Sequence, residues 1–256
     1  KSMKIKVIGS AILTCLVIIL LIIAMIKKYM PNDCMMALNE YYVVDETEAI
    51  VILETTTQEE RAVLADGGVY LPYKTVKTLL NSDFYLDEAE HVLLLALPTE
   101  LIQVSEGETH YSINQEERQL SAPALRNMGG TYFVSTEFVE LFSNVEFEYY
   151  SNPNRLIVHY QWVDFLYYNT VEEAPLRVEP SIKSEILVQL QEGAKLYYIG
   201  GTGTAGRSFI KVMTQDGIYG YVQRKFLNES YYEVRESSYQ APVYTYHTME
   251  EKVRLG

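Results

Sequence analysis

The chain contains one pattern twice. GGVYLPYKTVKTLL begins at Gly67 and GGTYFVSTEFVELF begins at Gly129. In each copy a glycine pair is followed by a tyrosine, a short apolar stretch and then apolar residues at helical spacing. Repetition at this scale indicates a duplicated structural unit. The repeat therefore predicts a folded domain that is distinct from the apolar segment before it and from a second, different β module after it.

Each copy has the periodicity of a strand followed by a helix. Val69 and Leu71 alternate as in a strand, whereas Val76, Leu79 and Leu80 follow the spacing of a helix. Two further apolar runs, joined by turn-forming residues, close each copy and predict one hairpin per copy. The paired runs lie at residues 84–86 and 92–95 in the first copy and at 147–149 and 156–158 in the second.

The segment 7–26, VIGSAILTCLVIILLIIAMI, is uncharged and predicts a transmembrane helix after a cytoplasmic stub, residues 1–6. About 20 apolar residues are enough for a helix to cross a hydrocarbon core of ~30 Å. The lysines that follow this segment replace the small-residue exit of a cleaved signal peptide. Because the stub is basic and the distal chain is acidic, we expect a single-pass protein of the cell membrane, held in lipid by this helix with its C-terminal bulk on the extracellular side.

The distribution of charge excludes nucleic acid as a partner. The chain has a formal net charge of −13, and five lysines are its only charged residues before Asp33, so the remainder carries −18. A surface of this sign repels the phosphates of nucleic acids.

Cysteine and histidine usage predicts no metal and no cofactor. Cys15 and Cys34 both precede the folded region, which excludes a disulfide framework and a cysteine-based zinc site within it. The glycine-rich segment 201–206 has the spacing G-x-G-x-x-G, but a strand-like FIKVM follows it instead of a helix that would hold a phosphate. Three histidines are not spaced as metal ligands and are expected to be solvated or hydrogen-bonded strand residues. They are His91, His110 and His159.

The duplicated region, residues 38–160, resembles the small N-terminal domain of copper amine oxidases, which recurs as a stalk module on the surface of Firmicutes. The resemblance rests on VYLPYKTVKTLLNSDFYLDE and TYFVSTEFVELFSNVEFEYY, each followed by a further strand. It implies a duplicated strand-helix-strand stalk domain. It implies no copper chemistry, because the copper ligands and the quinone-forming tyrosine of those enzymes belong to a separate domain.

Residues 163–228 resemble bacterial SH3-like domains through EGAKL, TQDG and GYV in that order. The resemblance implies a small β-barrel and a cell-wall peptide or glycan as ligand. Its aromatic residues are interpreted in two ways: they line a shallow groove for that ligand, or about half fill the core and the others stiffen strand faces. The groove residues in the first interpretation are Tyr167, Tyr197, Tyr219 and Tyr221. The expected strands are 165–168, 176–178, 195–199, 209–213 and 217–222.

Residues 229–256 are expected to be a linker ending in EEKVRLG, which resembles the first strand of the catalytic barrel in glycoside hydrolase family 18. The catalytic signature of that family, D-x-x-D-x-D-x-E, does not occur in the sequence, and neither does G-x-S-x-G or H-E-x-x-H. We therefore assign no catalytic residue to this chain, although the resemblance implies a glycoside hydrolase as the parent protein.

The sequence thus predicts a mainly β, α+β fold with a transmembrane helix, a duplicated stalk and a small SH3-like barrel. The expected function is that of a non-catalytic, membrane-anchored stalk and cell-wall-binding region of a family 18 protein acting on glycans that contain N-acetylglucosamine. Peptidoglycan or a related glycan or peptide is the expected partner. The alternative is a stand-alone, membrane-anchored binding or scaffold protein of the cell envelope.

Overall fold

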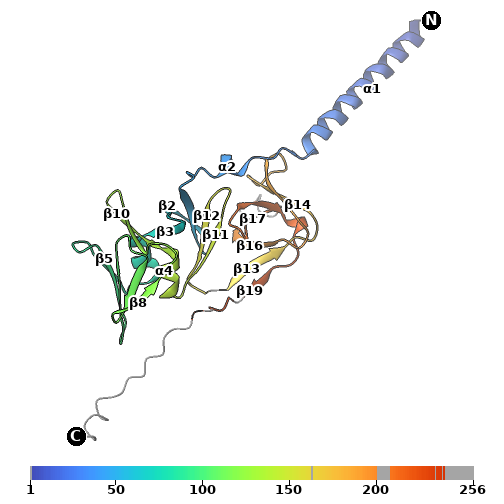
Figure 1. Ribbon diagram of the computed structural model, residues 1–256. Coiled ribbons are helices and arrows are strands. Elements are labelled where there is room, and N and C mark those ends of the chain that lie inside the picture. Colours follow the sequence, from blue (N-terminus) through green and yellow to red (C-terminus); the bar gives the residue numbers. More distant parts are fainter. Residues whose placement is uncertain (1, 163, 201–207, 234, 238, 240–256) are drawn as a thin grey trace, which may run out of the picture. The chain divides into compact units, whose positions relative to one another are not determined.

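The computed structural model describes residues 2–162, 164–200, 208–233, 235–237 and 239, with side chains from residue 13 onward. The glycine-rich segment 201–207 and the string KVRLG at 252–256 lie outside the described residues. The described chain is mainly β, and its strands form three sheets (Figure 1). It divides into two compact units. The first unit contains the residues up to Ala37, Tyr167–Thr214 and Ile218–Tyr231, and the second contains Leu38–Leu166, Gln215–Gly217 and the described residues from Tyr232 onward.

The second unit is built on a seven-stranded sheet with the order β11-β12-β1-β2-β3-β10-β9. All its pairs are antiparallel except β1 and β12, which run parallel. Its strands are β1 (Glu48–Leu53), β2 (Thr56–Ala65), β3 (Gly68–Pro72), β9 (Leu125–Met128), β10 (Thr131–Ser135), β11 (Glu146–Tyr150) and β12 (Arg155–His159).

The two copies of the repeat meet within this sheet, where β3 pairs with β10. Leu71 lies opposite Val134, and Phe133, the counterpart of Leu71 in the second copy, lies opposite Pro72. Exchanging the copies therefore reproduces the same register, so the duplicated strands are related by a local twofold axis. Both strands start after a two-residue turn with positive φ at both residues, Asp66-Gly67 and Gly129-Gly130, the geometry that favours a tight hairpin.

A short helix follows β3 in the first copy and β10 in the second, but the two helices begin differently. In the second copy the hydroxyl of Ser135 accepts the amide N–H of Phe138 at 3.2 Å and caps α4 (Thr136–Leu141). In the first copy Pro72 occupies the cap position and offers no side-chain hydrogen bond. There α3 (Tyr73–Thr75) continues into a π-helical turn, η1 (Val76–Leu80). The described part of this unit also contains α2 (Leu38–Tyr41).

A five-stranded antiparallel meander, β4-β5-β6-β7-β8, forms the other sheet of the second unit. One of its faces packs into a core shared with the helices and the large sheet, where the ring of Phe138 lies 6.0 Å from that of Phe84 and 5.5 Å from that of Tyr111. The two hairpins expected from the repeat are confirmed as β4–β5 and β11–β12. The strands are β4 (Phe84–Asp87), β5 (Val92–Ala96), β6 (Leu101–Ser105), β7 (His110–Ile113) and β8 (Glu116–Gln119).

The sheet of the first unit has the order β15-β14-β18-β17-β16-β13-β19, and its described strands do not close into a barrel. The expected SH3-like barrel is therefore corrected to an open sheet, because β15 at one end and β19 at the other pair with different neighbours and not with each other. Its elements are β13 (Phe165–Asn169), β14 (Ala174–Arg177), β15 (Ile186–Leu190), β16 (Lys195–Gly200), β17 (Phe209–Thr214), β18 (Tyr219–Gln223), η3 (Arg224–Phe226) and β19 (Tyr231–Glu233).

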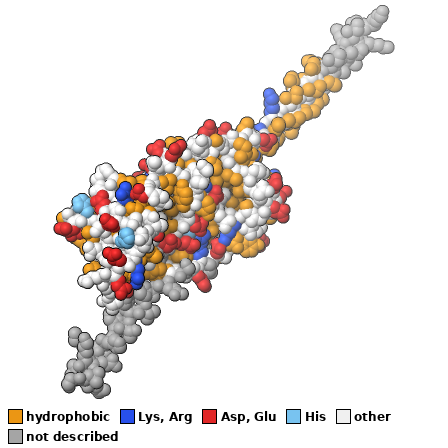
Figure 2. All heavy atoms as spheres, viewed as in Figure 1, with side chains coloured by type: hydrophobic (Ala, Val, Ile, Leu, Met, Phe, Trp, Pro, Cys, Tyr) orange, Lys and Arg blue, Asp and Glu red, His pale blue; other side chains and the backbone are white. Residues whose placement is uncertain are grey.

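The N-terminal helix α1 (Ser2–Tyr29) carries exposed apolar side chains along its described part (Figure 2). Within the part of the chain whose side chains are described, no helix is long and apolar enough to span a membrane. The transmembrane helix expected at 7–26, and the single-pass location in the cell membrane derived from it, are therefore corrected.

Candidate functional site

The four tyrosines expected to form a groove share one face of the first unit's sheet. Tyr167 lies opposite Tyr197, which lies opposite Met213, which in turn lies opposite Tyr219. Directly opposed residues point to the same face, and Tyr221 joins them because it follows Tyr219 by two positions. We call this set the tyrosine face: Tyr167, Tyr197, Tyr219 and Tyr221.

The tyrosine face is the reverse of the face that holds the unit's core. Leu196, Val212 and Val222 alternate with the face residues along the same strands and are fully buried. On the tyrosine face itself, Tyr197 is only 4% exposed and its neighbour Met213 only 1%. The other three tyrosines are half-buried. The structure therefore brings all four residues together but leaves only the outer three with ring surface that a ligand can contact.

One further aromatic side chain extends this surface. The ring of Tyr231, on β19, lies 5.7 Å from that of Tyr167 and is 47% exposed. The ammonium group of Lys195 stands 4.6 Å from the centroid of the Tyr167 ring, within the range of a cation–π contact. Sequence reasoning missed Tyr231 because it follows the last strand of the expected barrel. The sequence does contain a signal for this extra strand, the pair Tyr231-Tyr232, which is a β-forming dipeptide in an otherwise polar segment.

A buried ion pair lies at the ends of two parallel strands in the second unit. Leu53 is paired with Val158, so the next residues along each strand, Glu54 and His159, are neighbours. Nδ1 of His159 lies 3.0 Å from Oε2 of Glu54, and both side chains are more than nine-tenths buried. Nε2 of His159 lies 3.6 Å from Oε1 of Glu148 on β11.

Hydrogen bonds outweigh burial in setting the charges of this cluster. Burial opposes the charged form of Glu54, but His159 and the amides of Gln161 and Tyr160 bind its carboxylate and hold its pKa below the usual value. Burial likewise opposes the charged form of His159, but the two carboxylates raise its pKa. The hydrogen bond with His159 and one from the Tyr150 hydroxyl lower the pKa of Glu148 to about 2. The cluster therefore places the imidazole of His159 between two carboxylates that favour its charged form.

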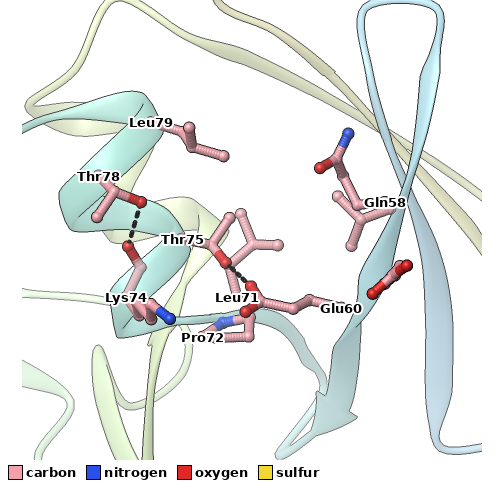
Figure 3. A pocket seen from close by; sticks show the side chains of 10 residues that line it. Gln58, Glu60, Leu71, Pro72, Lys74, Thr75, Thr78 and Leu79 are labelled. Atoms are coloured by element: carbon pink, nitrogen blue, oxygen red, sulfur yellow. Dashed lines mark hydrogen bonds between the residues drawn. The ribbon is translucent and has the colours of Figure 1, made fainter.

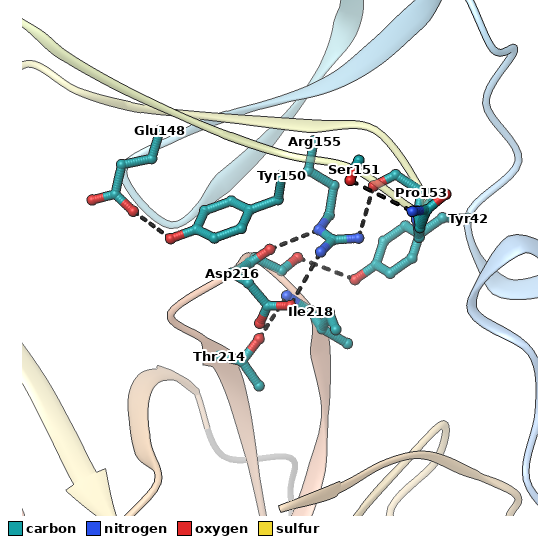
Figure 4. A network of polar contacts seen from close by, with 11 residues as sticks. Tyr42, Glu148, Tyr150, Ser151, Pro153, Arg155, Thr214, Asp216 and Ile218 are labelled. Atoms are coloured by element: carbon teal, nitrogen blue, oxygen red, sulfur yellow. Dashed lines mark hydrogen bonds and ion pairs between the residues drawn. The ribbon is translucent and has the colours of Figure 1, made fainter.

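A second polar network in this unit is centred on Arg155, whose side chain is almost fully buried (Figure 4). Its Nε donates to the backbone oxygen of Asp216 at 2.6 Å, and its Nη2 pairs with the carboxylate of Asp216 at 3.1 Å. Nη1 donates to the carbonyl of Pro153 at 2.9 Å. All its contacts are thus with fixed protein groups, which is typical of a structural arginine.

A hollow of about 320 Å³ lies beside the helix of the first copy (Figure 3). Its charged side chains include Glu59, Glu60 and Lys74. The carboxylate of Glu60 accepts the hydroxyl of Thr75, and the hydroxyl of Thr78 donates to the carbonyl of Lys74 at 2.8 Å. The lining therefore offers charged and hydrogen-bonding groups to a ligand.

The histidines are in different environments. His159 is the buried ion-pair partner described above, whereas His91 is exposed and lies 2.6 Å from the hydroxyl of Tyr132 and 3.0 Å from Glu106. His110 is exposed on β7. Among the described residues, no group of three or more potential ligands is arranged to hold a metal ion.

Comparison of the chain with protein-family models, with curated proteins and with solved structures found no match.

Proposed function

We propose that this chain binds cell-wall glycan or peptide through the tyrosine face, and that it is the non-catalytic region of a family 18 glycoside hydrolase acting on glycans that contain N-acetylglucosamine. The observation that carries the binding proposal is the row of tyrosines, interrupted by Met213 on β17, on the sheet face opposite the core. The resemblance of EGAKL, TQDG and GYV to wall-binding SH3-like domains supports the ligand class.

The geometry favours an elongated ligand. The row from Tyr231 to Tyr219 crosses five adjacent strands, β19-β13-β16-β17-β18. At ~4.8 Å between neighbouring strands it is about 19 Å long. Because Tyr197 is buried near its middle, the ligand contacts the two ends, Tyr231 with Tyr167 and Tyr219 with Tyr221. Each ring contributes about 1 kcal/mol, so a single site binds weakly and retention on a polymer depends on several contacts.

The proposal is tested by retention of the purified chain on isolated cell-wall sacculi. Tyr231→Ala removes the exposed end of the row and should lower retention about fivefold, the loss of about 1 kcal/mol. Tyr232→Ala is the matched control, because the neighbouring residue on the strand points to the opposite face and is 74% exposed. Both variants are compared by thermal unfolding, so that a loss of retention is attributed only to a folded protein.

We also expect no release of reducing sugar from sacculi by the purified chain. Release of sugar would refute the non-catalytic part of the proposal. Equal retention of the two variants and the unmodified chain would refute the assignment to the tyrosine face.

A further inference from the structure

A hollow of about 390 Å³ lies on the outer face of the five-stranded sheet in the second unit. It is lined mainly by polar side chains of β6, β7 and β8 and of the turn between β6 and β7. They include Gln103, Ser105, Glu108, His110, Ser112 and Glu117.

The hollow arises where two neighbouring strands separate. The ladder between β6 and β7 includes Ile102 opposite Ile113 and Gln103 opposite Ser112, and it does not extend to Ser105. The chain then turns back through residues 106–109, which include Glu108, before β7 begins. Because the strands diverge before the turn, their side chains border an open space instead of packing against one another.

The lining side chains point away from the core. Along β6, Ile102 and Val104 are buried while Gln103 and Ser105 are exposed. Gln103, Ser112 and Glu117 lie opposite one another on three adjacent strands and so share the outer face. The surface of the hollow therefore offers one amide, two serine hydroxyls, the imidazole of His110 and the carboxylates of Glu108 and Glu117, and no lysine or arginine of the described chain lines it.

The same rung extends to an aromatic ring. Gln103 lies opposite Leu94, which lies opposite Tyr85, and Tyr85 is 58% exposed. Two strand spacings separate Tyr85 from Gln103, or about 10 Å. An exposed ring beside a hollow lined with hydrogen-bonding groups suits a ligand with both a ring face to stack and hydroxyl groups to bind.

We propose that this surface binds an oligosaccharide with free amino groups, of the glucosamine type. The hydroxyls and the amide pair with sugar hydroxyls, the two carboxylates pair with protonated amines, and Tyr85 stacks on a neighbouring sugar ring. Charge complementarity favours an amine-bearing glycan over an acidic or neutral one. The amide, the hydroxyls and the ring favour a sugar over a lysine-rich peptide, which the carboxylates alone would recognise.

This site is independent of the tyrosine face, since the two share no residue and belong to different units. The test uses the full chain and isothermal titration with a glucosamine tetramer at about pH 6, where its amines are protonated. The N-acetylated tetramer and tetralysine serve as comparison ligands. We expect the glucosamine tetramer to bind in the high micromolar to millimolar range, more weakly as salt is raised, and at least tenfold more tightly than either comparison ligand.

Glu117→Gln and Glu108→Gln should each weaken this binding about tenfold, as expected for the loss of a charge-assisted hydrogen bond. Glu116→Gln is the matched control, because it removes the same charge from the same strand but on the opposite face. The double variant Tyr219→Ala, Tyr221→Ala should bind the tetramer unchanged, which separates failure of this proposal from failure of the tyrosine face.

Several results would overturn the proposal: no binding by the folded chain, equal binding of the acetylated tetramer, equal or tighter binding of tetralysine, or equal weakening by Glu116→Gln.

Discussion

Replacing His159 with glutamine should destabilise the second unit by about 3 kcal/mol, the lower end of the cost of removing one partner of a buried ion pair. The imidazole is almost fully buried 3.0 Å from the carboxylate of Glu54, which is itself buried. The substitution leaves that carboxylate without its counter-charge, although the amides of Tyr160 and Gln161 still bind it. For a unit of this size, about 3 kcal/mol corresponds to a decrease in Tm of roughly 6–12 °C.

The dependence of this stabilisation on pH follows from the shifts in pKa. The pKa of His159 is raised in the folded state, so its contribution is complete below the unfolded value of 6.5 and is lost as pH rises through the folded pKa. The pKa of Glu54 is lowered, so its contribution is complete above the unfolded value of 4.5 and is lost as pH falls through the folded pKa. The difference in stability between the unmodified chain and His159→Gln should therefore be largest between about pH 4.5 and 6.5.

Urea unfolding across this pH range measures the effect in the unmodified chain, His159→Gln, Glu54→Gln and the double variant. His110→Gln is the control, because His110 is exposed. In the double variant the loss should be smaller than the sum of the two single losses by more than 1 kcal/mol, because the two groups interact directly. Additive losses, a difference that does not vary with pH, or a loss no larger than that of His110→Gln would refute the reasoning.

Four further substitutions test the packing of the two units. Tyr70→Phe should raise stability by about 1 kcal/mol in urea unfolding, because the fully buried phenol has no hydrogen-bond partner among the described residues. Burial also raises the pKa of this phenol to about 12. A loss of stability would show that the hydroxyl is hydrogen-bonded. Gly220→Ala should cost about 2 kcal/mol, because a Cβ would lie 2.7 Å from the Leu176 side chain and 2.9 Å from a backbone oxygen of β14, and an unchanged melting temperature would contradict that close contact. Arg155→Met should cost about 3 kcal/mol, because it leaves the backbone oxygens of Asp216 and Pro153 without their hydrogen-bond donor. Asp216→Asn should cost less, because an amide oxygen can still accept from Nη2 of Arg155; the reverse order in thermal unfolding would contradict the role of these backbone contacts.

Local periodicity predicted the hairpins of the repeat and five strands of the first unit because alternation of apolar and polar residues depends only on which face is buried. The hairpins β4–β5 and β11–β12 have this pattern, and both form. The strand β15 escaped prediction because its sequence, ILVQL, is a short apolar run without alternation, which periodicity cannot distinguish from a helical segment.

The placement of the two hairpins could not be predicted from the repeat. Equivalent hairpins have similar sequences, yet β4–β5 joins the five-stranded sheet while β11–β12 joins the seven-stranded sheet. The difference arises because β12 pairs with β1, a strand that precedes the repeat and has no second copy. The same pairing brings Glu54 next to His159 across more than 100 residues of sequence, so the buried ion pair depends on a contact that no local pattern encodes.

The tyrosine face shows the same division between local and long-range information. The spacing of Tyr219 and Tyr221 places them on one face of any strand that contains them. Their alignment with Tyr167 depends instead on three cross-strand registers, and the bulges within two of the sheet's strand pairs show that registers change along the strands. A slip of one residue in any of these three pairings would turn its partner strand's tyrosine toward the core. The binding surface is therefore a consequence of register, and substitutions that move a bulge should affect ligand binding even where they leave every tyrosine in the sequence.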